Sequence, residues 1–282
     1  MYRRDELLFL STDSFSLNIP NFYADNFGYR LEYVYDNTVS KGLNLFNGTR
    51  YKIYVEQFKE IGVNNDGIID LIKSFGKPTQ NMVNIGFDYR RYDKIHRQII
   101  FAGRVAGSTS LAQQKVMYYL GGVDGWFVPR FNNDIQIDQT REYKYQALAT
   151  NMRGFTQNIR NGNNFLVINT EIRFPVFSYF LNRPIKSDLI KNFQLMPFAD
   201  LGAAWLGSDL FSYENRFNRI TVQGDPVSVT AIESKYPIVG GFGWGARSRL
   251  LGYFVRFDMA WGVQNNMIAE KPVYYVSLSL DF

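Results

Sequence analysis

Hydrophobic and polar residues alternate with a period of two along much of this chain, in segments of about ten residues. In the last segment Tyr274, Val276, Leu278, Leu280 and Phe282 share one face, and the residues between them, Tyr275, Ser277, Ser279 and Asp281, share the other. Successive side chains of a β-strand point to opposite faces, so this alternation is a strand signal. The chain is therefore predicted to be all-β.

About ten antiparallel strands are predicted by this alternation and by the turn residues between the segments. No amphipathic helix is predicted, although residues 1–10 and 185–191 can form short helical turns. The predicted strands are 273–282, 253–263, 238–250, 193–205, 164–174, 95–107, 81–91, 49–58, 29–36 and, more weakly, 14–19.

The second face of these strands carries arginines, acids, asparagines and many glycines. A soluble β-sandwich or barrel buries one face of its sheet and leaves the other in water. In an outer-membrane barrel the apolar face meets lipid and the polar face lines the lumen, with strands of about 9–11 residues. The pattern favours an antiparallel transmembrane β-barrel of the outer-membrane type over a soluble β protein.

Loop lengths agree with this interpretation, since outer-membrane barrels alternate short periplasmic turns with long external loops. We place the end of the last strand in the periplasm and count backwards. The longest connections then fall outside and the tightest turns fall inside. The external connections are 264–271, 207–234, 108–162, 61–79 and 20–27, and the periplasmic ones are 250–252, 177–190, 92–94 and 38–47.

Composition narrows the chemistry further. The net charge of +5 is spread out without a basic run, so nucleic-acid binding is not expected. There is no Cys and the single His is His96, so no metal or cofactor site is expected. No nucleophile–base pair is visible either, and the chain is not expected to be an enzyme.

The beginning of the chain carries no signal-peptide pattern. Either the protein stays in the cytoplasm or its true N-terminus lies upstream. With about ten strands, we expect residues 1–282 to be a single barrel domain, the C-terminal portion of a barrel of about 16 strands. The first strands and soluble N-terminal domains would then precede it.

Several motifs resemble the bacterial surface antigen superfamily, the outer-membrane assembly and secretion barrels typified by BamA and TamA. Met152-Arg153-Gly154-Phe155 is similar to the Arg-Gly-aromatic signature of its long external loop, and the pair Gly121-Gly122 precedes it. The chain departs from the family in one respect. About thirty residues separate Gly122 from Met152, and the insert 124–139 among them enlarges the loop. Further matches are Phe198, Asp200, Gly202 and Trp205, the Gly-rich strand 240–250 and the terminal aromatic Phe282.

The resemblance implies that the loop 108–162 folds into the lumen and that acids on the wall hold Arg153. Strand alternation supplies Glu171 and Asp200, which face inward on neighbouring predicted strands. An arginine fork binds carboxylates with a geometry that lysine cannot match. Arg153 would then be a structural latch with no catalytic role. In the alternative, the two acids pair only with Arg173, Arg247 or Arg249.

The resemblance also implies a bacterial outer-membrane location and a role in outer-membrane protein assembly or insertion. Its partners would be outer-membrane lipid, unfolded outer-membrane protein clients and accessory lipoproteins. Two alternatives stay open. One is a secretion or translocation pore that passes a polypeptide. The other is a barrel that anchors a functional N-terminal domain in the membrane.

Overall fold

A computed structural model describes residues 2–7, 22–64, 81–135, 137, 143–181, 183–223 and 228–278. The chain is all-β, and most of its strands join one sheet of twelve. These strands are β1 (Tyr2–Leu7), β2 (Phe22–Asp36), β3 (Val39–Gly42), β4 (Leu45–Asn64), β5 (Asn81–His96), β6 (Ile99–Ala112), β10 (Asn164–Arg173), β11 (Gln194–Trp205), β14 (Ile238–Leu250), β15 (Tyr253–Gln264), β16 (Met267–Ile268) and β17 (Val273–Leu278).

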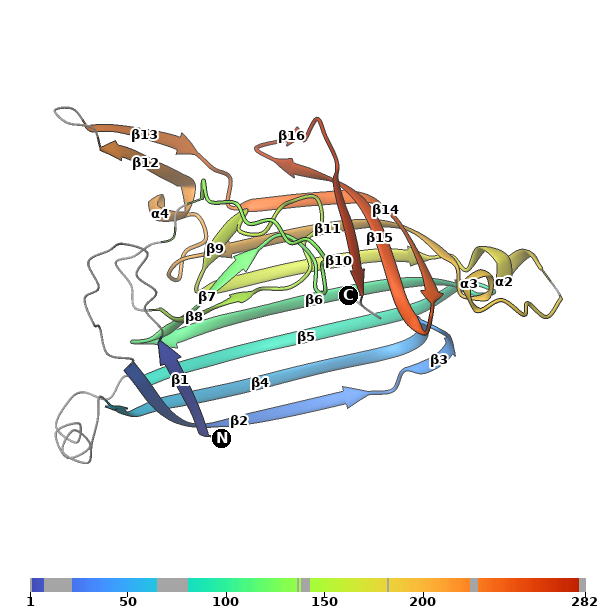
Figure 1. Ribbon diagram of the computed structural model, residues 1–282, viewed down its shortest axis with the longest axis horizontal. Helices are drawn as coiled ribbons and strands as arrows, with labels where there is room; N and C mark the ends of the chain where they lie inside the picture. The colour runs from blue at the N-terminus through green and yellow to red at the C-terminus, as the bar shows by residue number, and fades with distance from the viewer. Residues whose placement is uncertain are drawn as a thin grey trace, which may run out of the picture.

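The large sheet is an antiparallel meander in which each long strand pairs with the next one along the chain. Strand β1 pairs with β2 at one end of the sheet, and β17 pairs with β15 at the other. Among the described residues β1 and β17 do not pair, so the sheet is not closed into a barrel there. Figure 1 shows the sheet wrapping around the segment that holds the smaller strands β7 to β9.

The connections contain the remaining elements. Strands β7 (Lys115–Leu120), β8 (Tyr143–Leu148) and β9 (Arg160–Gly162) form a separate small sheet in the long connection between β6 and β10, and β12 (Phe217–Gln223) pairs with β13 (Ser228–Ser234). The helices are α2 (Val176–Phe180), α3 (Asp188–Lys191) and α4 (Tyr213–Arg216). None of the helices in the described part of the chain has the length and apolar character needed to cross a membrane.

The predicted strands correspond to β2, β4, β5, β6, β10, β11, β14, β15 and β17, and the helical turn expected within 185–191 is α3. The segment 14–19 lies outside the described residues. Near the beginning of the chain, two predictions were wrong. Residues 2–7 form strand β1 where a helical turn was expected, and residues 22–27 belong to β2 where a loop was expected. Both segments meet a partner through antiparallel pairing, which the local sequence alone does not reveal.

The tight turn expected at 92–94 was also misplaced. Strand β5 continues to His96, and the chain reverses at Arg97 and Gln98 before β6 begins at Ile99. Arg97 takes the positive φ of 49° that this turn requires. Tyr92 faces Ala102 across the pair and is buried with it, so hydrophobic packing extends the strand through the polar stretch.

The two faces of the large sheet differ in the side chains that they carry. Large hydrophobic side chains alternate along the strands and lie exposed on the outer face. In most folded proteins polar residues lie outside and large apolar patches are covered, so buried polar residues and large exposed apolar patches are informative exceptions. The exposed set includes Leu31, Tyr33, Ile53, Val55, Ile85, Phe87, Leu166, Ile168, Leu201, Phe242, Trp244, Phe257, Tyr274 and Val276.

On β6, β10, β11 and β15 the alternate positions point to the inner face and are buried there. On β10 the inward residues include Asn169, Glu171 and Arg173, all at most 1% exposed. Comparable buried charges on neighbouring strands are Arg104, Asp200, Arg247, Arg256 and Asp258. The polar face is therefore the enclosed one.

Candidate functional site: a loop arginine held by the sheet

The connection between β6 and β10 lies on the inner face of the large sheet. Strand β7 contacts β5, β6, β10 and β11, and β9 contacts β11. The loop was expected to span 108–162, but residues 108–112 are still part of β6. Its apolar residues Val116, Leu120, Met152 and Phe155 share a buried cluster with Phe165 and Val167 of β10. This packing holds the loop against the inner face of the large sheet.

Arg153 lies at the centre of the contact between the loop and the sheet. Its Nε and Nη2 donate hydrogen bonds of 2.7 Å to the two carboxylate oxygens of Asp200, and its Nη1 donates one of 2.7 Å to Glu171. The guanidinium carbon stands 3.7 Å from the ring centre of Phe198. Arg153 is 1% exposed, and both acid side chains are 0% exposed.

The two acids lie close together because their strands are neighbours in register. Asn169 of β10 faces Asp200 of β11, and Glu171 faces Phe198. Every second residue of each strand points inward, so Glu171, Phe198 and Asp200 form one patch on the inner face. Arg153 fills that patch with two carboxylates and one aromatic ring.

Glu171 is shared by three arginines. Besides Arg153, it accepts a 2.7 Å hydrogen bond from Arg247 and a 3.1 Å bond from Arg173. The pairings that the sequence left as alternatives therefore exist together with the Arg153 contact. Arg249 is different, because it lies 3.6 Å from Asp188 of α3 on a more exposed part of the surface.

The network keeps Arg153 charged. Burial alone would lower the pKa of this guanidinium, but the carboxylates of Asp200 and Glu171 raise the pKa above its ordinary value. Removing one partner of a buried ion pair costs about 3–5 kcal/mol, because the remaining charge is left without compensation. Because its guanidinium is held by one carboxylate on β10 and one on β11, Arg153 links the loop to both strands.

Glycines on β14 and β15 let the loop approach the sheet backbone. A Cβ on Gly241 would overlap the carbonyl oxygen of Arg153, and one on Gly262 would meet Phe155. Gly154 itself has a φ of 100°, which L side chains rarely adopt. The Gly-rich strand 240–250 therefore provides the surface on which Arg153-Gly154-Phe155 lies.

The hydroxyl of Tyr275 fastens the same turn from β17. It accepts a 2.9 Å hydrogen bond from the Gly154 N–H and donates one of 2.7 Å to the Phe155 carbonyl. Tyr275 is fully buried. A single phenol thereby accepts from the Gly154 N–H and donates to the Phe155 carbonyl, so it helps to satisfy two buried backbone groups of the loop.

The pair Gly121-Gly122 lies directly beside this turn. Both residues have positive φ, 112° and 84°. Gly122 exchanges two backbone hydrogen bonds with the loop: its N–H donates to Phe155, and its carbonyl accepts from Met152. The pair and the Arg-Gly-Phe turn are therefore adjacent in space, although about thirty residues separate them in the sequence.

The inserted part of the loop reaches the last described strand. Phe127 N–H donates to the carbonyl of Val276 at 2.9 Å, and Leu278 N–H donates to Gly125 at 3.3 Å. Trp126 packs on Tyr275 with ring centres 4.8 Å apart. The insert that was expected to enlarge the external loop thus lies against β17.

Three of the predicted C-terminal signal residues, Tyr274, Val276 and Leu278, lie exposed on the outer face of β17. Leu280 and Phe282 lie outside the described residues.

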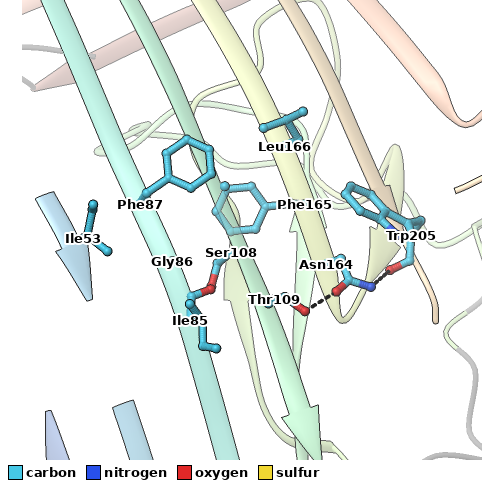
Figure 2. Close-up of a pocket in the computed structure, with 11 residues that line it drawn as sticks. Ile53, Ile85, Gly86, Phe87, Ser108, Thr109, Asn164, Phe165, Leu166 and Trp205 are labelled. Atoms are coloured by element: carbon cyan, nitrogen blue, oxygen red, sulfur yellow. Dashed lines mark hydrogen bonds between the residues drawn. The ribbon is translucent and has the colours of Figure 1, made fainter. Parts of the chain in front are cut away.

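A groove of about 440 Å³ crosses the outer face (Figure 2). It runs over β4, β5, β6, β10 and β11, and Gly107 leaves space there beside Phe87 and Leu166. At one end Thr109 donates a hydrogen bond to Asn164, which in turn donates to the carbonyl of Trp205. The apolar side chains around the groove include Ile53, Ile85, Phe87 and Leu166.

Sequence reasoning did not single out Tyr275 or the pairing of the insert with β17. Tyr275 falls on the inward face of its strand, which the alternation predicts, but its contact with the loop spans about 120 residues. In the sequence, only the high glycine content of this region indicated a steric role for Gly241 and Gly262.

No known protein family has a model that matches this chain, and no curated protein matches it in sequence. The resemblance of its motifs to the surface antigen superfamily therefore stays a prediction.

Proposed function

We propose that this chain forms the wall of a bacterial outer-membrane β-barrel that takes part in the assembly and insertion of outer-membrane proteins. The proposed membrane location rests on the two faces of the large sheet. Its outer face exposes Leu31, Ile53 and Trp244, with exposed fractions of 69%, 51% and 49%, while charged residues are buried inside. Covering such a face with hydrocarbon is favourable, and leaving it in water is not.

The proposed role in assembly rests on the contacts of Arg153 with the sheet. Arg153 stands between Asp200 and Glu171 in the arrangement that the resemblance to assembly and secretion barrels implies. Gly121-Gly122 lies against the same turn. These contacts support a loop that is held inside the wall and keeps the strands around it in register.

The inner face gives little support to a pore that stands open for secretion. The loop covers β5, β6, β10 and β11 from inside. The turn before β4 also reaches across, because Arg173 donates to the Asn44 carbonyl and Gln194 donates to the Leu43 carbonyl. We therefore favour assembly over polypeptide passage, and keep passage and membrane anchoring as outcomes of the test.

Depletion of the full-length protein in its own bacterium tests the proposal. Quantitative mass spectrometry of the outer membrane should show that many unrelated β-barrel proteins fall together, while periplasmic soluble proteins stay constant. Re-expression of the wild type should restore them, and Arg153→Ala should restore them poorly. Loss of secreted polypeptides alone would indicate a pore. An unchanged outer-membrane proteome would indicate an anchor and would contradict assembly.

A further inference from the structure

The connection between β10 and β11 packs on the outer face of the sheet, at the place where the strands end. Ser248 belongs to that face by the alternation of β14, yet it is buried, and its hydroxyl donates to the carbonyl of Leu189 in α3. Phe174, on the same side as the exposed Ile172, packs on Phe180 of α2 with ring centres 5.8 Å apart. Figure 1 shows α2 and α3 together at one end of the long strands. The two helices therefore lie beside the apolar face of the sheet.

Contacts with two neighbouring turns hold this connection in place. The hydroxyl of Tyr179 in α2 lies 3.0 Å from Nδ1 of His96 at the end of β5, and the guanidinium carbon of Arg97 lies 5.5 Å from the Tyr179 ring centre. On the other side, Asp188 of α3 lies 3.6 Å from Arg249 near the end of β14. The two helices, the β5–β6 turn and the β14–β15 turn thus form one surface, which we call the α2–α3 surface (residues 94–98, 174–193 and 249–253).

The α2–α3 surface exposes large apolar side chains. Phe180 is 66% exposed, and Leu251 in the β14–β15 turn is 90% exposed. Apolar side chains that are exposed together mark a site of protein or membrane contact. They continue the apolar outer face past the ends of the strands. The exposed set includes Ile95, Phe180, Leu181, Leu189, Ile190 and Leu251.

Exposed basic side chains accompany these apolar residues. The carboxylate of Asp188 is shared with Arg249, so it offsets little of the charge of the other cations. Positive charge beside exposed apolar side chains is the pattern of segments that bind the headgroup layer of an anionic membrane. The exposed cations are Lys94, Arg97, Arg183, Lys186 and Lys191.

We propose that the α2–α3 surface binds anionic phospholipid in the membrane leaflet beside it. The apolar side chains enter the boundary between headgroups and acyl chains, and the basic side chains hold the phosphate groups. A lipid fits this surface better than a soluble protein, because α3 lies on the outer face of the sheet, over Ser248. The inference rests on the proposed membrane location of the sheet and is independent of the proposed role in assembly.

Insertion is tested with Phe180→Trp in a background in which the four native tryptophans are replaced by phenylalanine. The full-length protein is reconstituted into bilayers that contain phosphatidylglycerol, with bromine placed either near the headgroups or deep in the acyl chains. Bromine near the headgroups should quench the new fluorescence more than deep bromine, and acrylamide should quench it little. A variant that keeps only Trp244 is measured in parallel. Quenching of Trp244 alone by brominated lipid would overturn this inference, and quenching at neither position would overturn the membrane location as well.

The role of the cations is tested by the preference for spin-labelled phosphatidylglycerol over spin-labelled phosphatidylcholine in the same bilayers. Wild type should associate with the anionic label roughly fivefold more strongly. Most of this preference should be lost in a triple variant of the α2–α3 surface, Arg183→Gln, Lys186→Gln and Lys191→Gln. A control triple variant neutralises three exposed cations outside this surface and should keep the preference: Lys59→Gln, Arg130→Gln and Lys271→Gln. Equal losses in the two variants, or no loss in the first, would overturn the proposal.

Discussion

The guanidinium of Arg153 meets the carboxylate of Asp200 in a two-pronged pair, with both hydrogen bonds at 2.7 Å. The backbone N–H of Arg153 also donates to Asp200 at 3.2 Å. Asp200 of β11 thus binds both the side chain and the main chain of Arg153. The remaining guanidinium nitrogen, Nη1, donates to Glu171 on β10. This relationship makes the position of the loop sensitive to single substitutions.

Arg153→Ala should lower the free energy of unfolding by about 3–5 kcal/mol, because it leaves Glu171 and Asp200 buried with fewer positive partners. The midpoint of the heat-induced change in gel mobility would measure this. Arg130→Ala is the matched control, since Arg130 is exposed in the same loop. Equal midpoints for the two variants would show that the latch does not stabilise the protein.

Gly241→Ala should displace the loop turn, because the new Cβ would overlap the Arg153 carbonyl. Overpacking of this kind costs about 1–3 kcal/mol. Gly240→Ala is the control, since a Cβ there finds only ordinary contacts, the nearest at 3.7 Å. Trypsin cleavage after Arg153, followed by peptide mass spectrometry, should accelerate in Gly241→Ala alone. Similar cleavage in both variants would refute the steric role of Gly241.

Tyr275→Phe should destabilise the protein by about 1–3 kcal/mol, because the buried Gly154 N–H loses the hydroxyl that accepts its hydrogen bond and the Phe155 carbonyl keeps only the Gly122 N–H. Tyr274→Phe, one residue earlier on the exposed face, should be nearly neutral. Thermal unfolding in detergent compares the two. If Tyr274→Phe were as harmful as Tyr275→Phe, the hydroxyl contact would not be the cause.

Lys235, just before β14, offers a test by pH. Its burial and, next, the positive charge of Arg160 lower the pKa of Lys235 from 10.5 to about 8. The folded state then binds fewer protons than the unfolded state between pH 8 and 10.5, so this group adds stability as the pH rises through that window. Acetylation of Lys235 should reach half its maximal rate near pH 8. A rate that is still rising steeply above pH 9.5, about where ordinary lysines begin to react, would refute the shift.

The sequence predicted the strands well because alternation is a local property. Strand β14 has the bounds expected from its pattern, and the inward direction of Glu171 and Asp200 follows from counting residues by two. The turn at Arg97 was missed because the polar residues before it looked like a turn, whereas Tyr92 packs into a buried cluster. The contacts of Tyr275 and Phe127 join segments far apart in the chain, so no local pattern could predict them.

The outer face of the sheet is the central element of the proposed function, and Trp244 reports on it directly. It is 49% exposed among other apolar side chains of that face. The measurement uses a variant in which the other three tryptophans are replaced by phenylalanine, reconstituted into bilayers with brominated acyl chains. We predict strong quenching of Trp244 fluorescence by the brominated lipid and little quenching by acrylamide in the water. Strong quenching by acrylamide and none by the brominated lipid would contradict a lipid-facing sheet.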